Sequence, residues 1–289
     1  MSFREKIEIN KPYISESTLN TYLTFLKRLN LSVDELKDFK KFSKNVEHLA
    51  YSSQRSYCSA VMAVLGDETP SEYKDHIVKS NQISNQFYSS HQKSEVQEKN
   101  WLSVEEIRKV VDKLNESRQP LTAWIVVNFY TFGILNDDVY FPPIRNEFST
   151  FRLTTRKPKD TSKNYLYVKK NGEMFMILNR YKGSEVKKLM KEQIQTRLPD
   201  ELAKKMRIYL DARNVKNGEL ILPKGQISTT LSRAFKKTGK RCGSSLLRKI
   251  YITKKYQKYL IPPKVVDEMN EDAKKMGHNT VSQQCYLKY

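Results

Sequence analysis

The stretch NYLYVKKNGEMFMILNRYK, residues 164–182, decides how the fold of this chain is read. Two strand-like runs flank Asn171-Gly172, and Asn-Gly between such runs is the strongest short-range signal of a β-hairpin. A third run, within residues 187–198, predicts a further strand. Elsewhere the apolar residues recur at helical spacing. We therefore predict a mainly α protein with a small antiparallel β-sheet, an α+β fold.

Helical patterns lie on both sides of this hairpin. Ser15 and Ser17 are candidate caps for the first of them, and Ser103 with Glu106 forms a capping box for another. The run at residues 123–132 is nearly continuous in apolar residues, which predicts a buried helix. The remaining predicted helices cover residues 18–29, 52–65, 200–212, 228–236, 244–259 and 263–271.

Composition divides the chain into three parts. Residues 1–79 predict a helical N-terminal domain, and residues 101–289 predict a second domain that carries the sheet. Between them, residues 80–100 are polar and rich in Ser, Gln and Asn, which is typical of a linker. No internal repeat interrupts this division.

Charge is the strongest bulk property of the chain. Its 289 residues hold 52 Lys and Arg against 32 Asp and Glu, a net charge of +20. Such a field attracts phosphate polymers such as double-stranded DNA. Residues 233–260 contain no acidic residue, so we predict that the basic side chains of this stretch contact DNA. They are Lys236, Lys237, Lys240, Arg241, Lys249, Lys254 and Lys255.

Several other classes of protein are disfavoured. No segment approaches the roughly 18 to 20 apolar residues of a membrane span, and the N-terminus lacks the apolar region of a signal peptide. The three cysteines show no CxxC spacing and the four histidines are scattered, which argues against a disulfide framework or a metal site. We expect an intracellular protein without membrane contact, metal or other cofactor.

Two arginines and the C-terminal segment suggest chemistry on phosphates. Arg145 follows the rigid segment Tyr140-Phe-Pro-Pro-Ile144, and Arg248 lies in the predicted helix SSLLRKIY. The guanidinium fork donates two hydrogen bonds to one phosphate. Near the C-terminus, Gly277-His278 precedes Tyr286 by about two helical turns. A tyrosine hydroxyl can attack a phosphodiester and hold the cut strand covalently.

In order and spacing, these residues resemble the tyrosine recombinase (integrase) family. Members carry a first arginine, a lysine on a β-hairpin, a His-x-x-Arg helix, a Gly-His pair and a nucleophilic tyrosine. The resemblance assigns catalytic roles to Arg145, Lys182, Arg248, His278 and Tyr286. It covers about residues 101–289, beginning with WLSVEEI, and more loosely the N-terminal helices as a core-binding domain. It implies a two-domain clamp on DNA.

The resemblance also implies a mechanism. Tyr286 would attack the scissile phosphate and form a 3′-phosphotyrosine, while Lys182 protonates the departing 5′-oxygen. Arg145 and Arg248 would hold the non-bridging oxygens, with His278 assisting. The implied protein is a cofactor-free, site-specific recombinase or integrase from a virus or mobile element. It would assemble as a dimer to tetramer on paired sites of double-stranded DNA in a host cell.

Some positions depart from the family pattern. Ser245 stands where the family has the histidine of His-x-x-Arg, and it remains a candidate phosphate contact. Phe148 occupies an acidic position, for which Glu147 is a substitute. Tyr289 is a second candidate nucleophile, and Lys169, Lys170 and Lys187 compete with Lys182. Two alternatives stay open: a DNA-relaxing enzyme similar to type IB topoisomerases, and a DNA-binding relative that has lost catalysis.

Overall fold

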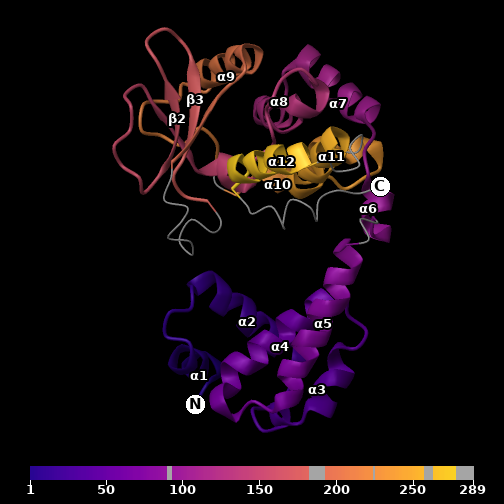
Figure 1. Cartoon of the computed structure of the whole chain (residues 1–289). Coiled ribbons are helices and arrows are strands. Elements are labelled where there is room, and N and C mark those ends of the chain that lie inside the picture. The colour runs from indigo at the N-terminus through magenta and orange to yellow at the C-terminus, as the bar shows by residue number, and fades with distance from the viewer. Residues whose placement is uncertain (90–92, 182–192, 224, 257–262, 278–289) are drawn as a thin grey trace. The chain divides into compact units, whose positions relative to one another are not determined.

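The structure, a computed structural model, describes residues 1–89, 93–181, 193–223, 225–256 and 263–277 (Figure 1). The chain forms two compact units, Met1–Ser90 and His91–Tyr289. Each unit has a hydrophobic core of its own. The boundary between the units falls within residues 80–100, and the role of that stretch as a linker stays a prediction.

The first unit is helical throughout its described residues. Helix α4 is its central element, because α1, α2 and α5 all pack against it. Both faces of α4 are therefore apolar, and Tyr57, Cys58 and Val61 are buried there. The elements are α1 (Phe3–Asn10), α2 (Glu16–Leu29), η1 (Glu35–Lys37), α3 (Phe39–Val46), α4 (Tyr51–Leu65), η2 (Gly66–Glu68) and α5 (Ser71–Ser89).

The sequence predicted α2 and α4 but missed α1, α3 and α5. The start of α2 is capped as expected, since the Ser15 side chain accepts a hydrogen bond from the backbone of Thr18. Helices α1 and α3 are short, and their starts depend on the caps Ser2 and Asp38 rather than on apolar periodicity. Capping residues are thus the signal that would have located them.

The polar stretch after residue 79 is more ordered than its composition suggested. Residues 80–89 continue α5, and α6 (Glu95–Asn100) begins at a capping box formed by Ser94 and Gln97. Tyr73 and Ser80 of α5 are buried; Tyr73 packs against Phe39 and Phe42 of α3, and α5 also packs against α4. This tertiary packing stabilises a helix that the Ser, Gln and Asn content alone disfavours.

The second unit combines a helical bundle with a sheet (Figure 1). Helix α8 is hydrophobic on all sides, as the sequence predicted, and α7, α9, α10 and α11 pack around it. Besides α6, the elements are α7 (Val104–Ser117), α8 (Leu121–Leu135), η3 (Asn146–Thr150), β1 (Phe151–Thr154), β2 (Asn164–Val168), β3 (Met174–Leu178), β4 (Ile194–Arg197), α9 (Asp200–Ala212), α10 (Ile227–Ala234), η4 (Lys236–Thr238), α11 (Ser244–Tyr256) and α12 (Pro263–Lys275).

The sheet is mixed, which corrects the prediction of an antiparallel sheet. Its strands lie in the order β1-β2-β3-β4, and β1 pairs with β2 in parallel. The predicted hairpin is confirmed, since β2 and β3 pair antiparallel, as do β3 and β4. Sequence patterns missed β1 because it spans only four residues directly after η3.

The turn of the hairpin depends on glycine. Gly172 has φ +87°, a left-handed conformation that side chains rarely adopt, and its carbonyl accepts a hydrogen bond from Arg207 of α9 at 2.8 Å. A Cβ at this position would lie 2.8 Å from the Arg207 guanidinium. The turn therefore requires the backbone freedom of glycine, and a hydrogen bond joins it to α9.

Two structural findings bear on the function classes. Among the described helices, none is long and apolar enough to cross a bilayer. Within the described ranges, no group of three or more His, Cys, Asp or Glu side chains is placed to hold a metal ion.

Cys58 and Cys242 are buried free thiols, and burial raises the pKa of each to about 12.

Candidate active site

Arg145 lies where the buried segment after α8 turns into η3. Phe141 and Ile144 anchor this segment in the core, and Arg145 is the residue that caps η3. Its side chain is half-buried, and its Nε has no hydrogen-bond partner among the described residues. A buried N–H without an acceptor costs about 1–3 kcal/mol. An anionic oxygen is the acceptor that would remove this cost.

Tyr130 of α8 connects the two candidate arginines. Its hydroxyl donates a hydrogen bond to the carbonyl oxygen of Arg145. Burial raises the pKa of Tyr130 well above its ordinary value; the Glu147 carboxylate acts in the same direction and the Arg248 guanidinium opposes both. The backbone of Arg145 and the side chains of Arg248 and Glu147 therefore lie near one buried phenol. No sequence pattern indicated this role, because Tyr130 lies in a nearly continuous apolar run.

Further hydrogen bonds join η3, which directly follows Arg145, to the helices α11 and α10. Ser244, in the first turn of α11, donates to Asn146 Oδ1 at 2.7 Å, and Asn146 Nδ2 donates to Ser228 Oγ at 3.5 Å. Arg248 lies one turn after Ser244 and is only 2% exposed. The residue that follows Arg145 is thus bound to the helix that carries Arg248. Ser245, the candidate phosphate contact, is exposed on that helix.

Phe148, at the position that is acidic in the resembled family, belongs to the core. It is 1% exposed and stacks on Phe129 of α8, with ring centroids 3.8 Å apart. This position therefore fixes η3 against α8. Glu147 is the carboxylate of η3, and its electrostatic effect on Tyr130 places it near the two arginines.

Lys182, His278 and Tyr286 lie outside the described residues. The residues directly before two of them are described, and they contact each other. Gly277 has φ +68°, and a Cβ there would lie 3.0 Å from the ring of Tyr181, which is itself buried. The residues that precede Lys182 and His278 thus lie next to each other, at a position where the backbone conformation and the close approach favour glycine.

The lysines that compete with Lys182 differ in setting. Lys169 forms an ion pair with Glu173 at 3.0 Å, and its ammonium lies 4.4 Å above the centroid of the Phe175 ring. Lys170 is exposed at the hairpin turn. Lys187 lies outside the described residues. Lys169 therefore has a structural role in the hairpin, and the choice of Lys182 stays a prediction.

The predicted DNA-contacting residues fall into two groups. Lys236, Lys237 and Arg241 are exposed, and Lys249 is half-buried. The pKa of Lys237 is lowered, mainly by the adjacent Lys113 of α7, so two ammonium groups lie close together on this surface. Such a pair is stabilised when an anion approaches.

The second group consists of lysines that are paired within the protein. Lys240 binds Glu106 at 2.7 Å, Lys254 binds Asp137 at 2.5 Å, and Lys255 binds Asp272 at 2.8 Å. Their acidic partners come from distant parts of the chain, which a reading of residues 233–260 alone could not reveal. Their contact with DNA stays a prediction, and the ion pairs give each of them a structural role.

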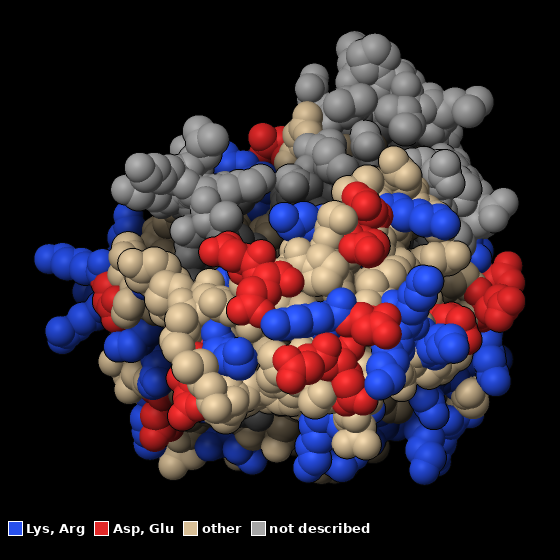
Figure 2. Space-filling model, turned by 90° about the horizontal axis from the view of Figure 1, so that it is seen from below, with Lys and Arg blue, Asp and Glu red and all other residues tan. Residues whose placement is uncertain are grey.

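Acidic side chains also interrupt the surface elsewhere. The face drawn in Figure 2 shows acidic side chains interspersed among basic ones, so the net charge of +20 is not one continuous basic patch there. Local groups such as Lys113 with Lys237 are therefore more informative than the total charge.

A buried polar cluster joins α11 to α12. Asp272 is 1% exposed, and its Oδ2 accepts hydrogen bonds from the Tyr256 hydroxyl and from Lys255. Burial raises the pKa of Asp272 to about 7 and lowers the pKa of Lys255 to about 8. Tyr140 covers the cluster, because Lys255 and Lys275 lie 4.2 and 4.0 Å from its ring centroid. No sequence pattern predicted this cluster.

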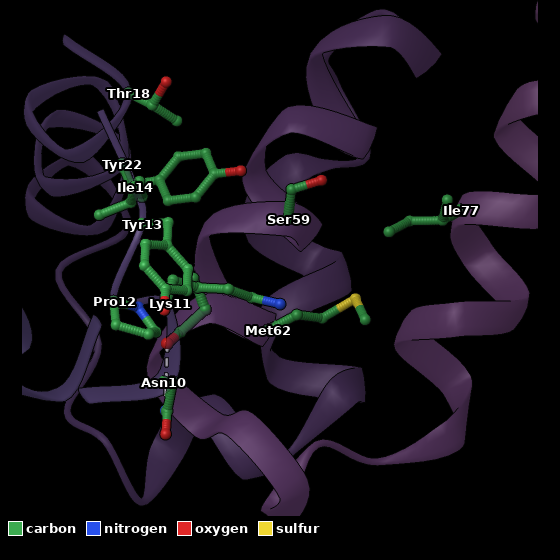
Figure 3. Close-up of a pocket in the computed structure, with 11 residues that line it drawn as sticks. Asn10, Lys11, Pro12, Tyr13, Ile14, Thr18, Tyr22, Ser59, Met62 and Ile77 are labelled. Atoms are coloured by element: carbon green, nitrogen blue, oxygen red, sulfur yellow. Dashed lines mark hydrogen bonds between the residues drawn. The ribbon is translucent and has the colours of Figure 1, made fainter. Parts of the chain in front are cut away.

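The first unit contains a pocket of a different kind (Figure 3). Its volume is about 510 Å³, and the rings of Tyr13 and Tyr22 line it together with Ile14, Met62 and Ile77. Lys11 is the charged residue among its described lining residues. The largely apolar lining lacks the paired cations that a reaction on a phosphate requires. We therefore locate the candidate active site in the second unit.

Comparisons with known proteins give limited information. No family model matches the sequence, and no curated protein matches it. Among solved structures, a crystal structure of XerA recombinase is similar, with a TM-score of 0.42 and 13% identity over 99% of this chain and 93% of that chain. Both values are low, so the function has to be inferred from the residues of the chain itself.

Proposed function

We propose that this protein cuts and rejoins DNA strands by the chemistry of tyrosine recombinases. In this proposal Tyr286 attacks the scissile phosphorus, the bond to the 5′-oxygen breaks, and a 3′-phosphotyrosine forms. Lys182 donates a proton to the departing 5′-oxygen, and His278 assists at the phosphate. Attack by another 5′-hydroxyl reverses the step, so the bond energy is retained without a cofactor.

The observation that supports this proposal is the convergence of Arg145 and Arg248 on Tyr130. A pentavalent phosphorus spreads negative charge over its non-bridging oxygens, and two guanidinium groups held by packed elements stabilise that charge. Arg145 also has a buried Nε without a described acceptor. We propose that Lys182 and His278 act on the same phosphate; the residues directly before them, Tyr181 and Gly277, lie next to each other.

The proposed partner is double-stranded DNA, bound largely through its phosphates. We propose that copies of the chain assemble on paired sites as a dimer to tetramer, which strand exchange between two duplexes requires. A monomer that relaxes supercoiled DNA would identify the outcome as topoisomerase-like instead, with the same chemistry at Tyr286.

Trapping of the covalent intermediate tests the proposal. A library of nicked duplexes with randomised sequence is incubated with the protein, so that the short 5′-hydroxyl fragment diffuses away and the adduct accumulates. Denaturing gels should show a protein–DNA adduct with the wild type and with Tyr289→Phe, and none with Tyr286→Phe. If the wild type forms no adduct with any duplex, the proposed activity is wrong and a non-catalytic DNA-binding role remains. An adduct with Tyr286→Phe would move the nucleophile to another residue.

A further inference from the structure

A basic pocket of about 430 Å³ lies beside the candidate active site in the second unit. It is enclosed by the end of η3, the strands β1 and β2, and the segment that follows β3. Arg152, Lys163 and Arg180 line it, together with the hydroxyl-bearing residues Ser149 and Thr150. Its described lining residues include no Asp or Glu. None of these residues has a role in the proposed cleavage step.

The charge of the pocket is only partly balanced. Lys163 pairs with Asp160 at 3.2 Å, and both side chains are about half exposed, so this contact is weak. Arg152 donates one N–H to the carbonyl oxygen of Gly218 at 2.7 Å and has no carboxylate partner among the described residues. A guanidinium has five N–H donors, so this anchor fixes Arg152 without exhausting it. Arg152 and Lys163 thus bring positive charge to a lining that holds no Asp or Glu among its described residues.

A buried asparagine builds the floor of the pocket. Asn164 is 2% exposed, and its Nδ2 donates to Thr150 Oγ1 at 2.8 Å and to the carbonyl oxygen of Arg180 at 2.7 Å. Its Oδ1 accepts from the backbone N–H groups of Asn179 and Arg180 at 2.8 and 2.7 Å. These four hydrogen bonds hold the segment of Arg180 against the end of η3. The backbone of Arg180 is therefore held in place beside Thr150.

The position of the pocket suggests its ligand. Arg145 directly precedes η3 and Thr150 ends it. A 3₁₀ helix rises about 2 Å per residue, so these two residues lie about 10 Å apart along the helix. Successive phosphates on one strand advance about 3.4 Å along the duplex axis. A strand whose scissile phosphate lies at Arg145 would place a phosphate a few nucleotides away at the other end of η3.

We propose that this pocket binds a non-scissile phosphate of the DNA backbone through Arg152 and Arg180, next to the phosphate that Arg145 and Arg248 hold. This inference rests on the proposed function, because it takes DNA as the substrate. The pocket contributes affinity and fixes the register of the strand, whereas the two catalytic arginines act on the reacting phosphate.

Binding of a mixed-sequence duplex tests the pocket without requiring cleavage, since phosphate contacts are independent of sequence. All variants are made in the Tyr286→Phe background, and affinity is measured by fluorescence anisotropy over a range of salt concentrations. The double variant Arg152→Gln with Arg180→Gln should bind about tenfold more weakly, and the slope of log K against log salt should fall by about 1 to 2. Arg152→Lys with Arg180→Lys should retain most of the slope because the charge remains.

The matched control is Arg108→Gln with Arg213→Gln, two exposed arginines of the same unit outside the pocket. An equal loss of slope in this control would overturn the inference while leaving the proposed cleavage untouched. If the pocket variant melts at a lower temperature than the wild type, Lys163→Gln with Arg180→Gln, which spares the Gly218 contact, replaces it.

A titration with inorganic phosphate separates the two sources of the ligand. If free phosphate binds tightly, the double variant abolishes that binding and duplex affinity is unchanged, the pocket serves a free phosphate and the DNA assignment is wrong. A wild type that binds no duplex overturns the inference and the proposed function together. A wild type that binds duplex with the expected salt slope but forms no adduct overturns the proposed function alone.

Discussion

Helix α11 begins and ends in polar junctions that balance their charges differently. At its start, the backbone of Arg145 and the side chain of Arg248 lie near Tyr130, and Glu147 is the carboxylate that acts on the same phenol. At its end, Lys255 is matched by Asp272 at 2.8 Å. The first junction has an excess of positive charge for an anion from outside, whereas the second is neutralised by α12. One basic stretch of sequence therefore contains both a candidate active-site residue, Arg248, and a lysine whose ion pair joins α11 to α12.

Removal of the guanidinium group at the first junction should give the largest effect. In the proposed function, Arg145→Gln or Arg248→Gln deletes a charged donor to the transition state, so we expect adduct formation to slow by about 10²- to 10³-fold. The rate is measured in a single turnover with a duplex recovered from the nicked library. Arg145→Lys should recover part of the loss, since it retains charge but not the planar fork.

Arg233→Gln, an exposed arginine on α10, is the matched control and should change the rate less than about twofold. If Arg145→Gln cleaves as fast as this control, the first junction is structural like the second one. The contrast between the two ends of α11 would then disappear.

At the second junction, the acid itself should make stability depend on pH. Burial raises the pKa of Asp272 from its ordinary value of 3.8 to about 7 in the folded protein, so the folded state resists ionisation. The unfolding free energy of the wild type, relative to Asp272→Asn, should therefore be highest below about pH 4 and fall as the pH rises to about 7. A shift of this size corresponds to at most about 4 kcal/mol.

Urea unfolding at several pH values measures this difference. Glu271→Gln, which removes the neighbouring exposed carboxylate, is the control and should show no such trend. Above about pH 8 the lowered pKa of Lys255 contributes in the opposite direction, so the test belongs below that pH. If wild-type stability instead rises relative to Asp272→Asn between pH 4 and 7, the ion pair with Lys255 dominates over burial.

Asn164 holds the backbone of Arg180 in the basic pocket by hydrogen bonds. Asn164→Ala removes four hydrogen bonds and leaves buried backbone groups of Arg180 without their partner, so we expect a loss of about 2 kcal/mol in unfolding free energy. Asn164→Asp keeps the two acceptor contacts and should lose less. If Asn164→Ala and Asn164→Asp lose the same unfolding free energy, the hydrogen bonds that Asn164 Oδ1 accepts from the backbone of Asn179 and Arg180 do not contribute to stability.

Local patterns in the sequence predicted most of the helices and the hairpin. The capping box at Ser103, the apolar run of α8 and the Asn-Gly turn each act within a few residues, and the structure confirms all three. The parallel partner β1 was not predictable in this way, because its four residues pair with a strand that begins ten residues after β1 ends.

The candidate site was predictable in part for the same reason. Arg145 and Arg248 stand out by their spacing, and the structure brings both to Tyr130. Asn164 and Asp272 could not be identified from the sequence, since a buried polar residue is defined by the segments that close over it. The linker at residues 80–100 and the viral or mobile-element origin stay predictions.

The smallest effects should separate the two kinds of lysine within the basic stretch. Lys237 is exposed beside Lys113, so Lys237→Gln should weaken duplex binding a few-fold and lower the salt slope by about 1, with unchanged stability. Lys240 is bound to Glu106 and to the carbonyl oxygen of Trp101, so Lys240→Gln should lower the unfolding free energy by about 1 kcal/mol and leave the slope nearly unchanged. Anisotropy and urea unfolding on the same two variants measure both quantities. A reversed pattern would mean that the ion pair opens when DNA binds, and that Lys240 belongs with the residues that face phosphate.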